Sequence, residues 1–411
     1  MTDSKIEELS LTRPQLGEIA DALAARIRRG LAASGEELAM LPTYLPEPDR
    51  EVAGEALVVD VGGTNVRAAR LALDASGRAA IPAGDRSAAL KNSWNSPAEF
   101  FSFQASLVPH MRGAQVLPLG YCFSYPSRSL PDRDAVLLGW TKELRVPGAV
   151  GEKVGAALKE ALRKEGVETG KVTVCNDTVA ALVGGSWKHE GGSGFSDFVG
   201  LIVGTGNNMA AFFPTRLITS GPIDHSYRRE RMAVNLESGN FHPPHLSRFD
   251  DELDETRPDA GAQRLEKAVS GKFLPPLYGY LLTGRVGTVR PSAEELFRLA
   301  YEEGSSPEGK LAAAVVNRSA DLVAATLAGL LEVLEPEGKV GILAEGSVIE
   351  KNPLYRKRVE NKLELLLGKG EKGEGRFELL QLDNVNLIGA AVAALIGNGK
   401  IITNNQDTII K

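Results

Sequence analysis

Two glycine-rich segments contain the groups best suited to hold an anion. One spans residues 58–67 and contains Gly62-Gly63-Thr64-Asn65, and the other spans residues 199–208 and contains Gly204-Thr205-Gly206. In each, a turn of small and polar residues separates two apolar runs, which is typical of a β-hairpin. Glycines permit positive φ and close approach to a ligand, and successive N–H groups can form an anion-binding cradle. Two such turns predict a duplicated fold that holds a polyphosphate between its halves.

An Asn-Asp pair follows a short apolar run at residues 172–175. Ligands usually bind at the carboxyl ends of strands in an α/β sheet. Asp177 therefore suits two roles equally well, a general base or the N-cap of the next helix.

Hydroxyl, ammonium and carboxylate groups occur in three further motifs. Ser124 ends an apolar run, and Thr141 and Lys142 follow it at a short distance. These side chains suit a polyol or a phosphate, although a surface turn is the favoured interpretation of each motif in isolation. Glu237 and Glu266 each offer a carboxylate that can accept paired hydrogen bonds from sugar hydroxyls, but either alone reads as an ordinary surface glutamate.

Alternating strands and helices must position these groups. Apolar residues at helical spacing predict a helix over residues 16–31, and the first hairpin spans residues 56–73. Ser96 and Pro97 suit the N-cap and first position of a helix, and Asn352 with Pro353 repeats that pattern. Residues 220–260 are predicted to be rich in loops. A long apolar helix is predicted over residues 311–334, and a helix of small residues over residues 387–396. This alternation predicts an α/β fold with mixed sheets.

Length and composition set further limits. The chain has 411 residues, a net charge of −6 and two cysteines. Two or more domains are expected at this length, and the negative charge disfavours nucleic acid or a membrane surface as partner. Two cysteines make no disulfide framework, and the first residues have no signal-peptide pattern. The sequence thus predicts a cytoplasmic protein, either a monomer or a homodimer.

Taken together, the motifs resemble those of hexokinases, in the same order. Seven segments carry the resemblance, which covers roughly residues 16–395: residues 60–67, 123–126, 140–142, 176–178, 200–208, 235–237 and 263–267. The resemblance implies an actin-like, duplicated ribonuclease-H-type α/β fold, with two lobes of mixed sheets around a central cleft. Residues 55–190 with 384–398 would form the small lobe, and residues 1–54 with 195–383 the large lobe.

The resemblance also implies a role for each motif residue. The implied reaction transfers a phosphoryl group from Mg-ATP to the 6-hydroxyl of a hexose, with glucose as the first candidate. Asp177 would be the catalytic base, with Lys142 facing the transferred group, and Asp60 would face Mg²⁺ through water. Sugar-binding positions would be Ser124, Thr141, Lys142, Asn176, Asp177, Asn208, Glu237 and Glu266. Nucleotide-binding positions would be Asp60, Gly62, Gly63, Thr64, Asn65, Arg67, Gly204, Thr205, Gly206, Gly346 and Ser347.

Two departures from the family pattern bear on these expectations. Ser238 stands where the family often has a tryptophan after the Asn-x-Glu motif, and this changes the edge of the expected sugar pocket. Glu345 precedes Gly346-Ser347 where an aspartate is common, so the nucleoside could differ from adenosine. A non-catalytic sugar sensor on the same scaffold is the alternative, although neither the base nor a phosphate loop is missing. Sugar is expected to close the lobes about residues 191–194 and the segment before Leu387.

Overall fold

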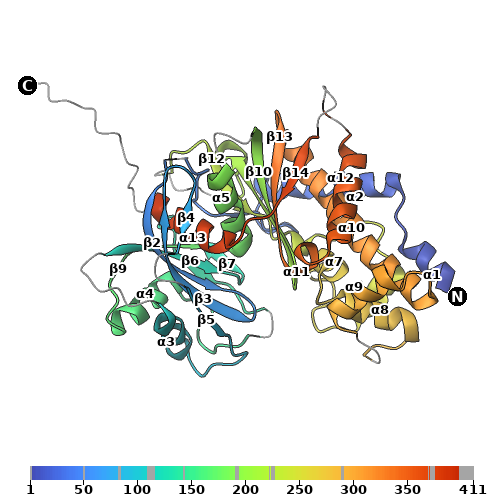
Figure 1. Cartoon of the computed structure of the whole chain (residues 1–411), viewed down its shortest axis with the longest axis horizontal. Coiled ribbons are helices and arrows are strands. Elements are labelled where there is room, and N and C mark those ends of the chain that lie inside the picture. Colours follow the sequence, from blue (N-terminus) through green and yellow to red (C-terminus); the bar gives the residue numbers. More distant parts are fainter. Residues whose placement is uncertain are drawn as a thin grey trace, which may run out of the picture.

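Two mixed β-sheets form the frame of the molecule (Figure 1). The structure is a computed structural model, and it describes residues 2–49, 51–81, 85–108, 116–141, 144–189, 194–221, 223, 227–287, 291–368, 370 and 375–397. Lys142, most of the expected hinge at residues 191–194 and the last residue of the expected small lobe lie outside this described part.

The first sheet has the order β4-β3-β2-β6-β9, and β5 also pairs with β3. Its long strands are apolar on alternate or on all positions, and therefore they are covered on both faces. A two-stranded ribbon of β7 (Ser127–Ser129) and β8 (Ala135–Leu137) lies beside it. The strands of the sheet are β2 (Gly54–Val61), β3 (Asn65–Leu73), β4 (Ala79–Ala80), β5 (Asp85–Ala89), β6 (Leu117–Phe123) and β9 (Thr169–Cys175).

The second sheet has the order β1-β12-β11-β10-β13-β14. It joins a segment from the start of the chain to strands from its second half, because β1 pairs with β12. Its strands are β1 (Leu41–Pro42), β10 (Phe195–Val203), β11 (Asn207–Pro214), β12 (Arg231–Asn235), β13 (Lys339–Glu345) and β14 (Phe377–Leu380).

The two sheets share one topology. In the first, β2 pairs antiparallel with β3 and parallel with β6, while β5 extends the β3 edge and β9 extends the β6 edge. In the second, β10 pairs antiparallel with β11 and parallel with β13, while β12 and β14 extend the two edges. The structure therefore confirms the predicted duplicated fold with mixed sheets.

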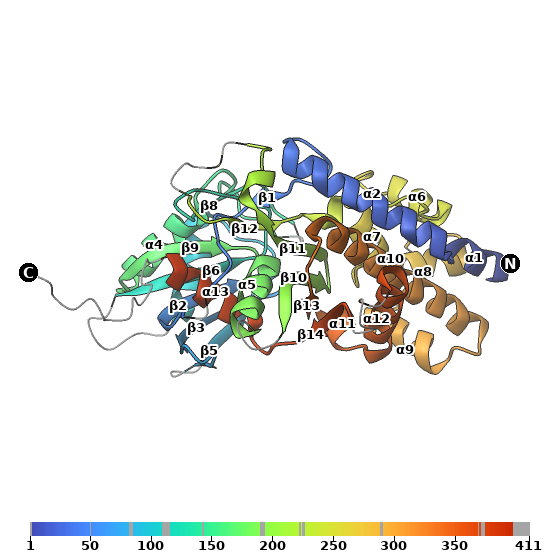
Figure 2. The ribbon, with the colours of Figure 1, turned by 90° about the horizontal axis from the view of Figure 1, so that it is seen from above.

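Helices cover both sheets in alternating layers (Figure 2). The first sheet packs on α3 (Pro97–Leu107) and α4 (Val154–Lys164) through one apolar core. A second core lies between the sheets and contains α5 (Asp177–His189) and α13 (Val385–Gly397). The outer face of the second sheet packs on a group of helices whose longest member is α10 (Pro307–Leu334).

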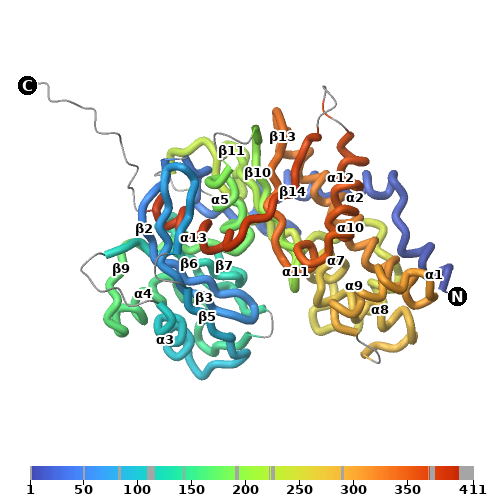
Figure 3. The backbone as a smooth tube through the Cα atoms, viewed as in Figure 1, coloured from blue at the N-terminus to red at the C-terminus, as the bar shows by residue number. Residues whose placement is uncertain are grey.

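The central helices cross from one half of the chain to the other, as the backbone trace shows (Figure 3). Helix α5 follows the last strand of the first sheet but packs on β10 and β11, whereas α13 follows the second sheet and packs on β2 and β6. The two helices cross closely, since a Cβ on Gly389 would lie 1.8 Å from the carbonyl oxygen of Ala180. This exchange places both sheets against one helical pair, and the lobe boundaries given above stay a prediction.

The remaining helices surround the second sheet. Among the described residues, α10 is long and apolar enough to cross a membrane, but 83% of its apolar window is buried in the protein. These helices are α1 (Thr2–Leu9), α2 (Arg13–Ala32), α6 (Arg248–Glu255), α7 (Arg264–Val269), α8 (Leu274–Thr283), α9 (Ala293–Glu302), α11 (Ser347–Glu350) and α12 (Pro353–Leu367), with 3₁₀ turns at Thr215–Leu217 and Ser238–Asn240.

Two local expectations meet different outcomes. Ser96 caps α3 as predicted, because its side chain accepts a hydrogen bond from the backbone N–H of Glu99 at 3.2 Å. Asn352 occupies the N-cap position of α12 as predicted, but its side chain makes no capping hydrogen bond: the side-chain amide instead donates to the carbonyl of Val348 at 2.8 Å. The amide thus closes the preceding helix, α11. Residues 220–260 are not simply loop, since they contain β12 and α6.

Candidate active site

The first glycine-rich turn joins β2 to β3 and is exposed at its tip. The backbone N–H of Gly62 donates to the carbonyl of Asn65 at 3.0 Å, which closes the turn. Thr64 and Asn65 are exposed, and their side chains hydrogen-bond to each other at 3.2 Å. Asp60 lies half-buried at the end of β2, opposite Cys122 of β6. The loop therefore presents hydroxyl, amide and backbone N–H groups beside a carboxylate.

Arg67 connects this hairpin to two other parts of the chain. Its guanidinium donates to the carboxylate of Asp85 at 2.7 Å and to the side-chain oxygen of Asn384 at 2.8 Å. Asp85 belongs to β5, and Asn384 immediately precedes α13 with a left-handed φ of 59°. The predicted nucleotide-binding arginine thus ties the first loop to the segment that enters the central helix.

Asp177 is the first residue of α5 and is half-buried. Its Oδ1 accepts the backbone N–H of Thr178 at 2.8 Å and the hydroxyl of the same residue at 3.2 Å. Among the described residues, no hydrogen bond or ion pair engages Oδ2. Asn176 also accepts from the backbone of Thr178, at 2.9 Å. One oxygen of Asp177 is thus held in place, and the other remains available to a ligand.

Ser124 and Tyr125 place the end of β6 beside the first loop. The backbone N–H of Ser124 donates to Val61 at 3.1 Å, and the Tyr125 hydroxyl donates to the carbonyl of Gly62 at 3.0 Å. Burial, together with the negative charge of Asp177, raises the pKa of Tyr125 well above its usual value. Tyr125 therefore stays a neutral hydrogen-bond donor between the loop and Asp177. Thr141 is half-buried in the same half of the molecule.

The second glycine-rich turn joins β10 to β11 and is packed from several sides. The backbone N–H of Gly204 donates to Gly206 at 2.9 Å, and the carbonyl of Gly204 accepts from Gly271 at 2.8 Å. The carboxylate of Glu266 accepts the backbone N–H of Asn207 at 3.0 Å. A predicted sugar-binding carboxylate therefore touches a predicted phosphate loop. Thr205 is the exposed residue at the tip.

A chain of amide and carboxylate contacts continues from this loop. The Asn208 side chain donates to Asn235 at 2.7 Å, and the Asn235 side chain donates to Glu237 at 2.8 Å. Glu237 has a left-handed φ of 55°, and Gln263, which precedes α7, has one of 52°. Such backbone strain in residues other than glycine is common at functional sites. The two segments that carry the sugar-site carboxylates are therefore both fixed by tertiary contacts.

Groups from the two halves meet around one small cavity of about 20 Å³. Asn176 and Tyr125, which follow strands of the first sheet, line one side of it. Asn235 and Thr43, at the ends of strands of the second sheet, line the other side. Thr43 holds its side of the cavity, since its hydroxyl donates to the carbonyl of Ala233 at 2.7 Å. The structure thus brings the Asn-Asp motif close to the Asn-Leu-Glu motif, although 57 residues of chain lie between them.

Gly346 and Ser347 lie next to the second loop. Gly346 has a φ of 105°, and a Cβ there would lie 2.6 Å from the carbonyl oxygen of Val203. Burial, with a smaller contribution from the neighbouring carboxylate of Glu350, raises the pKa of Glu345 to about 8. The backbone N–H of Gly346 donates to Glu350 at 2.6 Å. The expected nucleoside region therefore combines close backbone packing with a protonated carboxyl group.

The residues present suit a magnesium ion held mainly by a substrate. Among the described residues, no group of three or more His, Cys, Asp or Glu side chains is placed to hold a metal. Mg²⁺ usually keeps several waters and binds one or two carboxylates together with substrate phosphates. Asp60, beside the first loop, offers such a carboxylate.

Burial raises the pKa values of Cys122 and Cys175 far above the usual thiol range, so both stay neutral.

Comparisons with known proteins identify the family. Two hexokinase family models match the chain, one over residues 1–187 and the other over residues 198–290 and 306–396. The chain belongs to the hexokinase family. The resemblance stated from the motifs is therefore confirmed.

Curated hexokinases match different shares of the chain. Hexokinase-9 of Oryza sativa subsp. japonica is 31% identical over 65% of this chain and 55% of that protein. Hexokinase-3 of Mus musculus is 30% identical over 68% of this chain and 31% of that protein. The chain thus spans about half of the rice protein and a third of the mouse protein. Hexokinase-1 of Oryza sativa subsp. japonica is 28% identical over 92% of this chain and 87% of that protein.

Solved structures confirm the fold class. The hexokinase of Schistosoma mansoni, solved in complex with glucose, has a TM-score of 0.80 at 24% identity and covers 96% of this chain and 98% of its own. A ROK family glucokinase of Streptomyces griseus, solved with glucose and AMPPNP, has a TM-score of 0.52 at 20% identity over 83% and 99% of the two chains. The actin-like, duplicated fold is shared by these kinases.

The sequence predicts a positive φ for the glycines of the two loops, and this prediction is wrong for three of them. Gly62, Gly204 and Gly206 all lack the positive φ expected of them. In the second loop, close approach is the reason instead: a Cβ on Gly206 would lie 2.7 Å from Glu266, and one on Gly204 would lie 3.2 Å from Gly346. Small size rather than unusual backbone conformation is what this loop requires.

Three contributors to the site were not predicted. Tyr125 and Asn235 lie within quoted motifs, and hydrogen-bonding capacity next to Ser124 and Glu237 could have identified them. Thr43 is 190 residues away from its partner Ala233, and no local signal marks such a contact.

Proposed function

We propose that this protein is a hexokinase that transfers the terminal phosphoryl group of Mg-ATP to the 6-hydroxyl of a hexose, with glucose as the first candidate. Asp177 carries the proposal, because one carboxylate oxygen is fixed by Thr178 and the other makes no hydrogen bond or ion pair within the described chain. Membership of the hexokinase family supports the reaction class.

Residues from both halves of the chain contribute to the proposed reaction. Asp177 takes the proton of the attacking hydroxyl, a step worth about 10²–10⁴-fold in rate. Asn176 and Ser124 contact the sugar from the first half, together with Thr141 and Lys142. Asn208, Glu237 and Glu266 contact it from the second half. Paired acceptors of this kind fix the orientation of vicinal hydroxyls.

The nucleotide phosphates are held by the two loops. Backbone N–H groups and the side chains of Thr64, Asn65 and Thr205 donate to phosphate oxygens. Arg67 supports the first loop, and Gly346 with Ser347 lies where the nucleoside would be held. Asp60 would hold Mg²⁺ through water, and this ion would neutralise charge on the phosphates. Phosphoryl transfer then depends mainly on positioning and charge stabilisation.

Relatives support the choice of substrates. The Schistosoma mansoni hexokinase was solved with glucose, and the Streptomyces griseus glucokinase with glucose and the nucleotide analogue AMPPNP. The two small-molecule partners proposed here are therefore a hexose and a nucleoside triphosphate. A cytoplasmic location suits substrates of this kind.

A coupled assay of ADP formation tests the proposal. Wild type and Asp177→Asn are compared with Mg-ATP and a panel of glucose, mannose and fructose. Hexose-dependent turnover should fall by about 10²–10⁴-fold in the variant, while glucose binding measured by calorimetry should change little. Glucose binding without turnover in the wild type would instead establish the sugar sensor, and no binding at all would refute the sugar site.

A further inference from the structure

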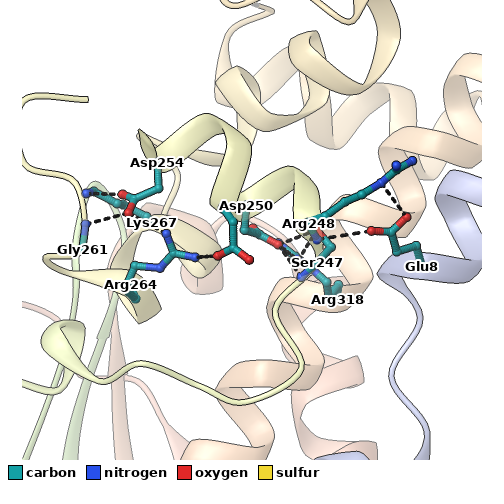
Figure 4. Close-up of polar contacts among 10 residues, drawn as sticks. Glu8, Ser247, Arg248, Asp250, Asp254, Gly261, Arg264, Lys267 and Arg318 are labelled. Carbon is teal, nitrogen blue, oxygen red and sulfur yellow. Dashed lines mark hydrogen bonds and ion pairs between the residues drawn. The ribbon is translucent and has the colours of Figure 1, made fainter. Parts of the chain in front are cut away.

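Helix α7, which carries Glu266, is held by a buried carboxylate on the preceding helix α6 (Figure 4). Asp254 pairs with Lys267 through one oxygen at 2.6 Å and with Arg264 through the other, also at 2.6 Å. The second oxygen also accepts the backbone N–H of Gly261 at 2.7 Å. Asp254 thus joins α6, the connecting loop and α7 at one point.

The two cations lie on either side of Glu266 in the sequence and are almost fully buried. The side chain of Arg264 is 5% exposed and that of Lys267 is 9% exposed. Asp251 and Asp259 also pair with one cation each, but their side chains are 57% and 47% exposed. Solvent screens such exposed pairs strongly. Asp254 is therefore the main electrostatic hold on α7.

Asp254 is ionised in the folded protein. Its burial opposes the charged form, but hydrogen bonds from Lys267 and the backbone of Gly261 outweigh this and lower the pKa of Asp254 to about 2. Removing this charge would leave two buried cations with exposed partners only. A buried ion pair that loses one member is strongly disfavoured, and the cations would move toward solvent.

The space available to Glu266 makes its position sensitive to such a movement. Its carboxylate accepts the N–H of Asn207 at 3.0 Å. A Cβ on Gly206 would lie 2.7 Å from that carboxylate, and one on Gly239 would lie 3.2 Å from the Glu266 side chain. Glu266 is thus enclosed by the second phosphate loop on one side and by the segment after Glu237 on the other.

We propose that Asp254 is a positioning residue for the hexose site, which acts by holding α7 so that the Glu266 carboxylate stays against the second phosphate loop. The inference rests on the proposed function, because it takes Glu266 as a contact of the sugar. If so, hexose affinity depends on Asp254, a carboxylate on α6, although the proposed sugar contact Glu266 lies on α7.

A matched control is available one turn earlier on the same helix. Asp250 is also buried, and its ion pair with Arg318 of α10, at 2.7 Å, lowers the pKa of Asp250. Its hydrogen bonds within the described chain go to Ser247 and Arg318 and not to a cation of α7. Asp254→Asn should raise the KM and the dissociation constant for glucose by about tenfold, with less than about a twofold change in the KM for ATP. Asp250→Asn should lower Tm to a similar extent and leave both glucose constants within about twofold.

A double-mutant cycle with Glu266→Gln separates positioning from general loss of stability. If Asp254 acts through Glu266, then Asp254→Asn should have less than about a twofold further effect on glucose affinity once Glu266 is changed. Fully additive effects, or equal effects of Asp254→Asn and Asp250→Asn on glucose affinity, would overturn the proposal. So would an unchanged glucose affinity in Asp254→Asn.

The result for Glu266→Gln alone distinguishes a failure of the positioning role of Asp254 from a failure of the sugar contact of Glu266. A loss of glucose affinity in Glu266→Gln without one in Asp254→Asn overturns the positioning role alone. No loss in Glu266→Gln overturns both the positioning role and the sugar contact. If Asp254→Asn does not fold, Lys267→Met removes one of the two cations and keeps the Arg264 pair. The same loss of glucose affinity, smaller in size and absent in the Glu266→Gln background, is then expected.

Discussion

The first phosphate loop is exposed at Thr64 and Asn65, whereas the second has Gly204 and Asn207 buried. Both connect the first two strands of sheets with the same topology. The first is held by its own turn, by the Tyr125 hydroxyl on the carbonyl of Gly62 and by the backbone N–H of Leu90 on that of Thr64. Arg67 follows the turn, and its ion pair with Asp85 is partly exposed. The second packs on Gly271, Gly346 and Glu266.

The difference lies in what surrounds each loop rather than in the loops themselves. Glu266 accepts a hydrogen bond from Asn207 at the end of the second loop, so that the proposed sugar and phosphate sites adjoin there. We infer that the second loop is a fixed part of the sugar site, while the first is coupled to the central helices through Asn384.

The strongest test of this contrast is Gly206→Ala. The added Cβ would lie 2.7 Å from the Glu266 carboxylate, at the end of a flexible side chain. The fold can accommodate it by moving that carboxylate, and thus Tm should change little. Glucose affinity should fall by about 10²-fold, which corresponds to the loss of about 2.7 kcal/mol of charge-assisted hydrogen bonding. Calorimetry without nucleotide measures this directly.

Gly62→Ala is the matched control in the first loop. Its Cβ would lie 3.6 Å from the carbonyl oxygen of Asn65, an ordinary contact distance. Glucose binding should therefore stay at the wild-type level, whatever happens to nucleotide affinity. Equal losses of glucose affinity in the two variants would remove the proposed difference between the loops.

Much of this frame could be predicted from local sequence. The helical spacing of apolar residues predicts α2, and the capping residues predict the start of α3. The glycine-rich turns predict the two hairpins. The duplicated topology followed from the repeated hairpin and the family resemblance. Each of these signals involves residues within a few positions of one another.

The parts that were missed depend on distant contacts. Strand β12 begins with Arg231 in a charged, proline-flanked region, yet it is stabilised because Arg231 pairs with buried Asp197 at 2.7 Å. Helix α6 is rich in acidic residues and was read as loop, but its buried aspartates pair with cations of α7 and α10. Sequence spacing carries no information about such pairs. The actual role of each site residue likewise stays a prediction.

A smaller effect is expected where the first loop meets the central helices. Asn384→Gly removes the acceptor of Arg67 but keeps a residue that tolerates the left-handed φ of 59°. The KM for ATP should rise by about three- to tenfold, and high salt should widen the difference from wild type, because it screens the partly exposed Arg67–Asp85 pair that alone holds Arg67 in the variant. Glucose affinity should be unchanged. A loss of glucose affinity as large as in Gly206→Ala would contradict the separation of the two loops.

The smallest effect concerns the buried surroundings of the second loop, where Glu345 precedes Gly346. Burial raises the pKa of Glu345 from 4.5 to about 8, so the folded protein retains a proton that the unfolded chain loses. Stability from this group is present below about pH 4.5 and is lost as pH rises through about 8. Glu345→Gln removes that loss, and it should gain about 1–2 kcal/mol over wild type at pH 8.5 relative to pH 7.0. Denaturant midpoints at the two pH values measure the gain, with Glu378→Gln, whose side chain is 49% exposed, as the control. A constant offset between Glu345→Gln and wild type at both pH values would mean that the carboxyl group is not buried, and that the second loop is as open to water as the first.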